Sequence, residues 1–422
     1  MAENKRKYAH IASDMIFSIA GVVVLNAVIQ LFIYPSFNRT LGADRYGDAI
    51  TVMSMVAVVG IGFGIGLNYS RMVMSTKKRD VKGDYNIFLL IAWALCVPAA
   101  YITGRFFLSS YTFVELVLIY LLMIVTVTRY YSDAEYKLNM NFKRYFVFYL
   151  CITLGYCAGM PVFFKTGNWF VPMIVGEVAA TAYTAIRGRL YKDGLLRPSE
   201  FFRDDLRSGA LLSLSYVADT LIQNADRLLL SLFFKDGSMV TTFYNSALIG
   251  KVVALLTTSL NSVLIGYLSK FEGKLTKKFF NLIAAALLVV GALATAACFV
   301  VSHIFIKLFY PDLYEACRPY FLIANAGQIL YFISSTILVV VLRFAPEKYQ
   351  TYINVLYAAL YLAVVPAMTL KFEIWGLAVG ILIVNLLKYA IVYVIGVTQL
   401  GKRLKERADE TTDQQDFDVF VR

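Results

Sequence analysis

The stretch Phe279–Ile306 reads FFNLIAAALLVVGALATAACFVVSHIFI and contains no Asp, Glu, Lys or Arg. A helix needs about 20 apolar residues to cross roughly 30 Å of hydrocarbon, so this stretch is long enough to span a bilayer. Six further uncharged runs meet the same requirement: Met15–Asn38, Ala49–Ser70, Tyr85–Gly104, Tyr145–Phe164, Pro319–Leu342 and Tyr349–Leu370. Together these runs predict an all-α polytopic membrane protein.

The composition supports this fold class. Of the 422 residues, 59% are hydrophobic and 16% are charged, whereas soluble domains carry about 25% charged residues. The first apolar run is too long for a cleavable signal peptide and lacks a small-residue cleavage site behind it, so we expect it to remain as a span.

Five further segments have the length of a span but carry isolated charges. They are Thr112–Tyr131 with Glu115, Asn168–Ile186 with Glu177, Gly209–Phe234 with Asp219, Asp226 and Arg227, Ser238–Leu268 with Lys251, and Ile374–Thr398 with Lys388. The sequence therefore predicts about twelve transmembrane helices. The loops between them are too short to fold a catalytic domain, so we expect the function to lie within the membrane.

The distribution of Lys and Arg predicts the orientation. Most of the 40 basic residues, Arg129 and Lys137 among them, fall in alternate loops and at both termini, and such residues concentrate on the cytoplasmic side. The other loops carry only Arg39, Arg45, Arg105, Lys165, Lys235, Lys307, Arg318 and Lys371. We therefore expect an inner-membrane protein with both termini in the cytoplasm. This topology accounts for the net charge of +12, and no nucleic-acid partner is expected.

The longest polar stretch between spans lies near the middle of the chain. It predicts an N-terminal six-helix bundle at 1–190, a cytoplasmic linker at 191–207, a C-terminal six-helix bundle at 208–400 and a cytoplasmic tail at 401–422. A weak parallel repeat relates Tyr46 to Tyr244 and Asn86 to Asn281. Two six-helix halves in the same orientation would enclose a central cavity between them.

The segment Gly209–Phe234 holds the candidate site. Ser215, Asp219, Gln223 and Arg227 recur every four residues and share one helical face, with Asp226 beside it. Charges within hydrocarbon are costly, so they face a cavity or a partner. Two interpretations remain open: an Asp–Arg pair that only holds helices together, or a cavity wall with a cation for an anionic solute and an acid that titrates.

Three other features need an interpretation. Lys251 lies too far from either end of its span to reach the surface easily, which favours a cavity, whereas Lys388 is close enough to the cytoplasmic end to extend toward the headgroups. The glycines at 60, 62, 64 and 66 do not form a phosphate loop, because no strand precedes them and no Lys-Ser/Thr follows. Close helix packing or a hinge explains them better.

Short motifs in the chain resemble the polysaccharide-biosynthesis flippases of the Wzx type. Leu41-Gly42 followed by Tyr46-Gly47-Asp48 resembles their "LG…YG" signature, as does Phe63-Gly64-Ile65-Gly66 followed by Arg71. In the second half, Asp226-Arg227 followed by Tyr244, Ala247 and Lys251 is similar to a second pattern of this family. The general resemblance covers nearly the whole chain, although the motifs are short.

This resemblance implies a fold and a function. Wzx flippases belong to the multidrug/oligosaccharidyl-lipid/polysaccharide exporter (MOP) superfamily, whose members form two bundles around a V-shaped cavity and work by alternating access. The implied substrate is an undecaprenyl-diphosphate-linked oligosaccharide, moved from the inner to the outer leaflet, with glycan-assembly proteins as expected partners. A diphosphate needs cations in the bilayer, which Arg227 and Lys251 would supply, with Arg39, Arg45 and Arg71 at the cavity mouths.

The acids on the same helix suggest how transport could be driven. Asp226 is the first candidate for coupling to an ion gradient and Asp219 the second. Burial raises the pKa of a carboxylate and a nearby arginine lowers it, so a group under both influences could exchange protons.

Other functions are less well supported by the residues. A MATE-like drug/cation antiporter would need acids in its cavity, where this chain offers Arg227 and Lys251. A membrane-embedded glycan polymerase would carry a large basic outer loop, and an acyltransferase would carry a histidine constellation. The two histidines, His10 and His303, lie far apart and the five cysteines show no paired spacing. We therefore expect no enzyme activity, no catalytic residue, no metal and no cofactor.

Overall fold

The structure is a computed structural model that describes residues 17, 19–76, 82–188, 190–191, 196–254, 261, 276–346 and 348–420. Within these ranges every regular element is a helix. The chain divides into two compact units, Met1–Thr241 and Thr242–Arg422.

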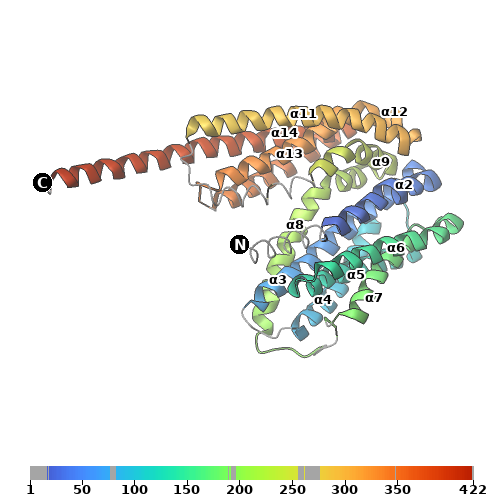
Figure 1. The fold of residues 1–422 in the computed structure, drawn as a ribbon. Helices are drawn as coiled ribbons and strands as arrows, with labels where there is room; N and C mark the ends of the chain where they lie inside the picture. The colour runs from blue at the N-terminus through green and yellow to red at the C-terminus, as the bar shows by residue number, and fades with distance from the viewer. Residues whose placement is uncertain are drawn as a thin grey trace, which may run out of the picture. The chain divides into compact units, whose positions relative to one another are not determined.

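The first unit is a bundle of long helices (Figure 1). It contains η1 Ile29–Ile33, α2 Tyr34–Val59, η2 Gly60–Ile65, α3 Gly66–Ser75, α4 Lys82–Ile102, η3 Thr103–Phe107, α5 Phe113–Leu138, α6 Phe142–Thr166, α7 Phe170–Arg187 and α8 Phe202–Phe234. Helix α9, Gly237–Ser246, crosses the boundary to the second unit. Helix α7 packs on both α5 and α6.

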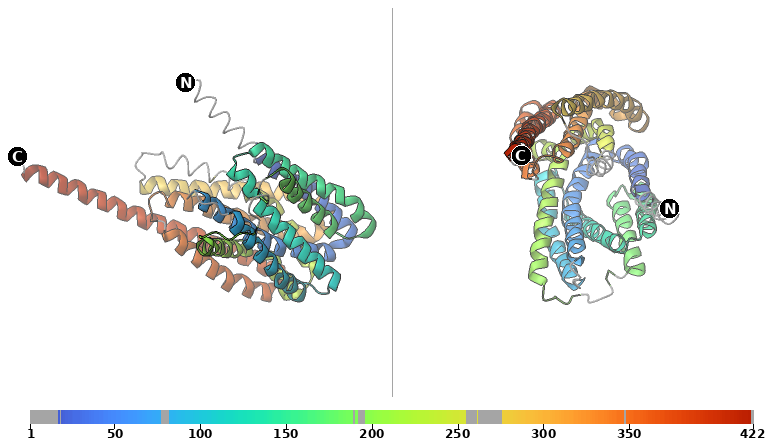
Figure 2. Two further views of the ribbon diagram at one scale, coloured as in Figure 1. Left: turned by 90° about the horizontal axis from the view of Figure 1, so that it is seen from below. Right: turned by 60° about the vertical axis from the view of Figure 1, so that its left-hand side comes forward.

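The second unit is built on three long helices that lie side by side (Figure 1). It contains α11 Lys277–Phe309, η4 Pro311–Leu313, α12 Tyr314–Cys317, η5 Arg318–Tyr320, α13 Phe321–Val341 and α14 Lys348–Phe420. Figure 2 shows α14 continuing past its neighbours toward the C-terminus. Phe280, Ile337, Val341, Tyr389 and Val392 lie in the core between these helices.

Seven helical stretches in the described part of the chain are long and apolar enough to cross a membrane. Two of them are interrupted by residues with non-helical backbone, Ile19–Ser75 at Gly42 and Lys348–Lys402 at Glu373. Each of these two stretches therefore consists of two helices joined at the interruption. The prediction of an all-α multi-pass membrane protein is confirmed.

Helix α11 shows how the apolar surface is distributed. Leu282, Leu293, Val300 and Ile304 are each more than half exposed, whereas Phe280 on the same helix is fully buried. Such a continuous apolar surface would be unfavourable in water, but it is the surface that a bilayer requires.

The helix ends follow from local sequence. Thr112 caps α5 in a capping box: its hydroxyl accepts from the Glu115 backbone N–H, and its own N–H donates to the Glu115 carboxylate at 2.7 Å. Thr276 caps α11 in the simpler way, through the N–H of Phe279. Gly167 ends α6 in the left-handed conformation, with φ of 69°.

The "LG…YG" segment forms a tight backbone contact with the start of α9. A Cβ on Gly47 would lie 1.7 Å from the carbonyl oxygen of Gly237, so only glycine fits there. The Gly237 N–H donates to Asp44 at 2.9 Å, and the Thr241 hydroxyl donates to the Ala43 carbonyl at 2.7 Å. This motif therefore has a packing role within the first unit.

The glycine run from Gly60 to Gly66, in η2 and at the start of α3, also serves helix packing, as the sequence indicated. A Cβ on Gly60 or Gly64 would collide with α5, and a Cβ on Gly62 or Gly66 would collide with α8. Helices α5 and α8 both pack on η2. Helix α8 also packs on α2 and α3 in the first unit, although the predicted bundle boundary groups it with the C-terminal half.

Candidate functional site

Arg227 lies in the C-terminal half of α8 and contacts α2. Its Nη1 donates a hydrogen bond of 3.0 Å to the Ser54 hydroxyl, and its Nε lies 3.6 Å from Oδ1 of Asp226. The Asp226 side chain is 4% exposed and that of Arg227 is 16% exposed. Both residues of this Asp–Arg pair lie on α8, so the pair itself joins no two helices, whereas the Arg227–Ser54 bond joins α8 to α2. A guanidinium has five N–H donors, so one arginine can serve both an ion pair and an anionic solute.

The polar stripe that precedes Arg227 lies on the surface of the first unit. Ser215, Asp219 and Gln223 are all exposed. Gln223 donates to Asp219 at 2.7 Å, and the Ser215 hydroxyl donates to the Leu211 carbonyl on its own helix. In a membrane protein, three exposed polar side chains on one helical face indicate contact with water or with a polar ligand.

Lys251 belongs to the second unit and lies just after a break in the helix. Residues 248–254 are helical, and Ala247 separates them from α9. The fully buried Asn325 of α13 bridges this break: its Oδ1 accepts from the Gly250 N–H at 2.6 Å, and its amide donates to the Ser246 carbonyl at 3.1 Å. Asn325 therefore fixes the backbone immediately before the half-buried Lys251.

The three arginines predicted at the cavity mouths have different environments. Arg39 and Arg45 are exposed, on either side of the Gly42 break. Arg71 is 4% exposed and its Nη1 donates a short hydrogen bond to the Tyr131 hydroxyl of α5. Arg71 thus contributes to the packing of α3 against α5.

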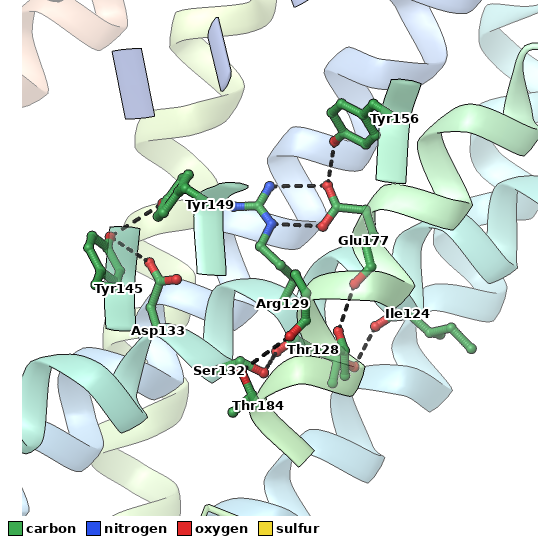
Figure 3. Close-up of polar contacts among 12 residues, drawn as sticks. Ile124, Thr128, Arg129, Ser132, Asp133, Tyr145, Tyr149, Tyr156, Glu177 and Thr184 are labelled. Atoms are coloured by element: carbon green, nitrogen blue, oxygen red, sulfur yellow. Dashed lines mark hydrogen bonds and ion pairs between the residues drawn. The ribbon is translucent and has the colours of Figure 1, made fainter. Parts of the chain in front are cut away.

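The first unit also contains a buried charge network that was not predicted from the sequence. Arg129 of α5 and Glu177 of α7 form two hydrogen bonds of 2.7 and 3.2 Å (Figure 3). The Tyr156 hydroxyl of α6 donates to the same carboxylate at 2.8 Å, so the network joins three helices. The Arg129 guanidinium also lies 3.5 Å from the centre of the Tyr130 ring. A buried ion pair with such satisfied geometry is costly to break.

A second carboxylate lies one turn further along α5. Asp133 accepts a hydrogen bond from Tyr145 at 3.2 Å (Figure 3) and another from Lys137 at 3.4 Å. The hydroxyls of Tyr145 and Tyr149 are hydrogen-bonded to each other at 3.3 Å, and because the Tyr145 hydrogen goes to Asp133, Tyr149 is the donor. Arg129, Asp133 and Lys137 therefore form an i, i+4, i+8 stripe of alternating charge that faces α6 and α7.

The sequence contained a signal for this network. Arg129 and Lys137 were assigned to a cytoplasmic loop, although the segment Thr112–Tyr131 already included Arg129. Alternating charges at four-residue spacing, together with Glu177 inside another span, would have suggested an interhelical pair. In the structure α5 continues to Leu138, so these residues are helical rather than in a loop.

Lys388 differs from its expected position. It does not extend to the headgroups but is 4% exposed, with its ammonium nitrogen 4.0 and 4.5 Å from the ring centres of Tyr331 and Tyr357. Cation–π contacts with two tyrosines compensate part of the cost of its burial.

The described helices form a polytopic helical membrane protein with the MATE-like fold that is seen in solved structures of the MOP superfamily. The structure of the lipid II flippase MurJ in an inward closed conformation superposes with a TM-score of 0.65 at 16% identity, and covers 93% of this chain and 87% of MurJ. The MATE transporter VcmN of Vibrio cholerae gives a TM-score of 0.56 at 13% identity, covering 94% of this chain and 97% of VcmN. A MOP-superfamily transporter from Pyrococcus furiosus gives 0.54 at 13% identity, covering 93% and 95%.

At these identities the similarity establishes the fold. No family model matches the sequence, and no curated protein matches it. Among the described residues, no group of three or more His, Cys, Asp or Glu side chains is arranged to hold a metal ion.

Proposed function

We propose that this protein is a flippase that moves an undecaprenyl-diphosphate-linked oligosaccharide from the inner to the outer leaflet of the cytoplasmic membrane by alternating access. The observation that carries the proposal is Arg227, a guanidinium held in the C-terminal half of α8 by Ser54 and Asp226. A cation fixed within a membrane helix attracts the anionic part of an amphipathic solute, and a diphosphate matches the geometry of a guanidinium.

The fold supports this class of function. MurJ, which shares the fold over 93% of this chain, is itself a lipid II flippase. A transporter of this architecture needs no catalytic residue, and the expected substrate is a lipid with a charged, glycosylated head. In this proposal Lys251 acts with Arg227 on the diphosphate, while Arg39, Arg45 and Arg71 serve the entry and exit of the substrate. Glycan-assembly proteins would be its partners.

The second candidate function is a MATE-like drug/cation antiporter. VcmN has the same fold, and Asp219 is exposed on the face of α8 that carries Arg227, where it could bind a cation. The two functions predict opposite effects of removing Arg227. Binding of an anionic lipid should become weaker, and binding of a cationic drug should become stronger. A polymerase or acyltransferase has less support, because none of the contacts described here resembles an acid–base or nucleophile arrangement.

The test is transport in vesicles containing the purified full-length protein. A fluorescent oligosaccharide on undecaprenyl diphosphate is placed in the vesicles, and its translocation is followed with a membrane-impermeant quencher. We expect Arg227→Ala to slow translocation at least about tenfold, which corresponds to the loss of about 1.4 kcal/mol of transition-state stabilisation. Arg227→Lys should retain part of the activity, because it keeps the charge.

Controls separate transport from folding. Thr398→Ala removes an exposed hydroxyl that bonds only to carbonyls of its own helix in α14, and it should leave translocation unchanged. Uptake of ethidium into the same vesicles tests the antiporter. Ethidium transport without lipid translocation by the wild-type protein would overturn the flippase proposal in favour of the antiporter.

A further inference from the structure

One end of the first unit contains a cavity of about 390 Å³, and Arg45, which we propose to serve the entry and exit of the substrate, is one of its lining residues. It is lined by α2, by the segment that precedes α5, and by the turn between α6 and α7. Its volume falls within the range of small-molecule sites, about 300–1,000 Å³. The loops at this end are those with few basic residues, namely Arg39, Arg45, Arg105 and Lys165. Because basic residues concentrate on the cytoplasmic side, we expect this end of the unit to face outward.

The polar side chains of this outer-end cavity come from three separate parts of the chain. Arg45 and Asp48 belong to α2, Glu115 to α5, and Asn168 to the turn before α7. Trp169 supplies an aromatic surface beside them and stacks on Phe170 at 3.9 Å between ring centres. Carboxylates, amides and an indole in one small cavity are the groups that bind sugars, whose hydroxyls both donate and accept hydrogen bonds.

Local contacts orient two of these groups. The Oε2 atom of Glu115 accepts two hydrogen bonds from Thr112, from its N–H at 2.7 Å and from its hydroxyl at 3.0 Å, so the capping box fixes the carboxylate while Oε1 takes no part in it. Asn168 uses Oδ1 to accept from the Phe170 N–H at 3.1 Å, which orients the two N–H donors of its amide. The cavity therefore presents an acceptor and a donor in fixed positions, as selective recognition of hydroxyl groups requires.

The charge of the cavity distinguishes it from a phosphate site. Two carboxyl groups, Asp48 and Glu115, accompany the single guanidinium of Arg45, so the cavity carries no excess of positive charge. Carboxylates next to a diphosphate would repel it, whereas they accept hydrogen bonds from neutral hydroxyls. The cavity is thus suited to the uncharged sugar part of a glycolipid rather than to its anionic part.

We propose that the outer-end cavity binds a neutral sugar residue of the glycan as it arrives at the outer leaflet. This inference rests on the proposed flippase function, and it assigns to Asp48, Glu115, Asn168 and Trp169 the role of a sugar subsite. Holding the glycan on the outer side would disfavour its return.

The experiment measures binding of the glycan without its lipid. The probe is the reducing oligosaccharide released by mild acid from the polyprenyl-diphosphate lipids of the native host. It is titrated by calorimetry into the purified full-length protein, in a detergent whose headgroup is not a sugar. We expect saturable binding to the wild type, weakened about fivefold by Asp48→Asn, since the loss of one hydrogen bond costs about 1 kcal/mol.

Two further variants complete the binding experiment, a control outside the cavity and a second variant within it. Asp312→Asn makes the same chemical change at an exposed carboxylate of the second unit, and it should leave binding unchanged. Glu115→Gln retains a side-chain oxygen for the capping box, so it tests the cavity in a variant that folds even if Asp48→Asn does not. Unchanged binding in both cavity variants, or no binding to the wild type, would overturn the sugar subsite.

The outcome is also separable from that of the flippase proposal. Translocation of the lipid-linked substrate without binding of the free oligosaccharide would remove the subsite and leave the flippase standing. Binding of the oligosaccharide at the cavity, with no translocation of the lipid-linked form, would leave a sugar site in a protein of another function.

Discussion

Arg129 of α5 and Glu177 of α7 are joined by two hydrogen bonds, of 2.7 and 3.2 Å, while their side chains are 7% and 3% exposed. Neither charge can turn toward solvent if its partner is removed. We predict that Glu177→Ala destabilises the folded protein by about 3–5 kcal/mol, because it leaves a buried guanidinium without its counter-charge.

Thermal unfolding in detergent would measure this effect. The double variant Arg129→Met with Glu177→Met should recover much of the lost stability, since an apolar pair of similar volume avoids the buried charge. A double variant no more stable than Glu177→Ala would show that the network contributes more than mutual neutralisation.

Helix α6 provides a direct test of orientation. Its 25 residues, at about 1.5 Å each, exceed the thickness of the hydrocarbon core, and exposed lysines lie near both ends, Lys143 and Lys165. In a background with all five cysteines replaced by alanine, we expect Lys165→Cys to react with an impermeant thiol reagent added to intact cells. Lys143→Cys should react only after the membrane is made permeable. The reverse labelling pattern would invert the predicted topology.

The contact between Gly47 and Gly237 predicts a severe effect from one methyl group. Gly47→Ala should strongly reduce the amount of folded protein, because its Cβ would overlap a backbone carbonyl that cannot rotate away. Gly167→Asn is the matched control: Gly167 has φ of 69° and open space around its Cα, and asparagine tolerates this conformation. Size-exclusion profiles of fluorescent fusions would compare the two. Equal profiles would contradict the packing role assigned to Gly47.

Asp226 is proposed to couple transport to a proton gradient, with Asp219 as the second candidate. A diphosphate that binds Arg227 competes with the Asp226 carboxylate 3.6 Å away and favours its protonation. We expect Asp226→Asn to bind substrate but to lose the response of translocation to an imposed pH gradient in vesicles. Asp204→Asn, at an exposed position in the first turn of the same helix, should respond as the wild type does. A wild-type response in Asp226→Asn would leave Asp226 only the role of neutralising Arg227.

Much of the architecture could be predicted because a helix that crosses the lipid must be apolar over about 20 residues. The run Phe279–Ile306 lies inside α11 and the run Tyr145–Phe164 inside α6, since an uncharged segment of this length has no other stable environment. The MATE-like fold could likewise be predicted from the resemblance of short motifs, in which Gly47 and Gly66 pack against the backbone of Gly237 and Ser213.

The charged residues were harder to predict. Sequence alone placed Arg129 in a loop, because the positive-inside rule counts basic residues without regard to their partners. Its partner Glu177 is 48 residues away, a pairing set by the packing of α5 on α7 rather than by any local pattern. Lys388 was misjudged for a related reason: its nearest aromatic partners, Tyr331 and Tyr357, come from other parts of the second unit.

The glycine run of η2 also determines how this sequence can diverge over evolution. A Cβ at Gly62 would meet the Cγ2 methyl of Val217 at 2.3 Å but its Cα and Cβ only at 3.1 and 3.2 Å, so alanine at position 62 requires Val217 to become alanine and a shift of a few tenths of an ångström. At Gly66 the obstacle includes the Ser213 backbone, with Cα at 2.5 Å and N at 2.7 Å, which no change of side chain can remove. Homologous chains should therefore show correlated exchange between positions 62 and 217, and an invariant glycine at position 66.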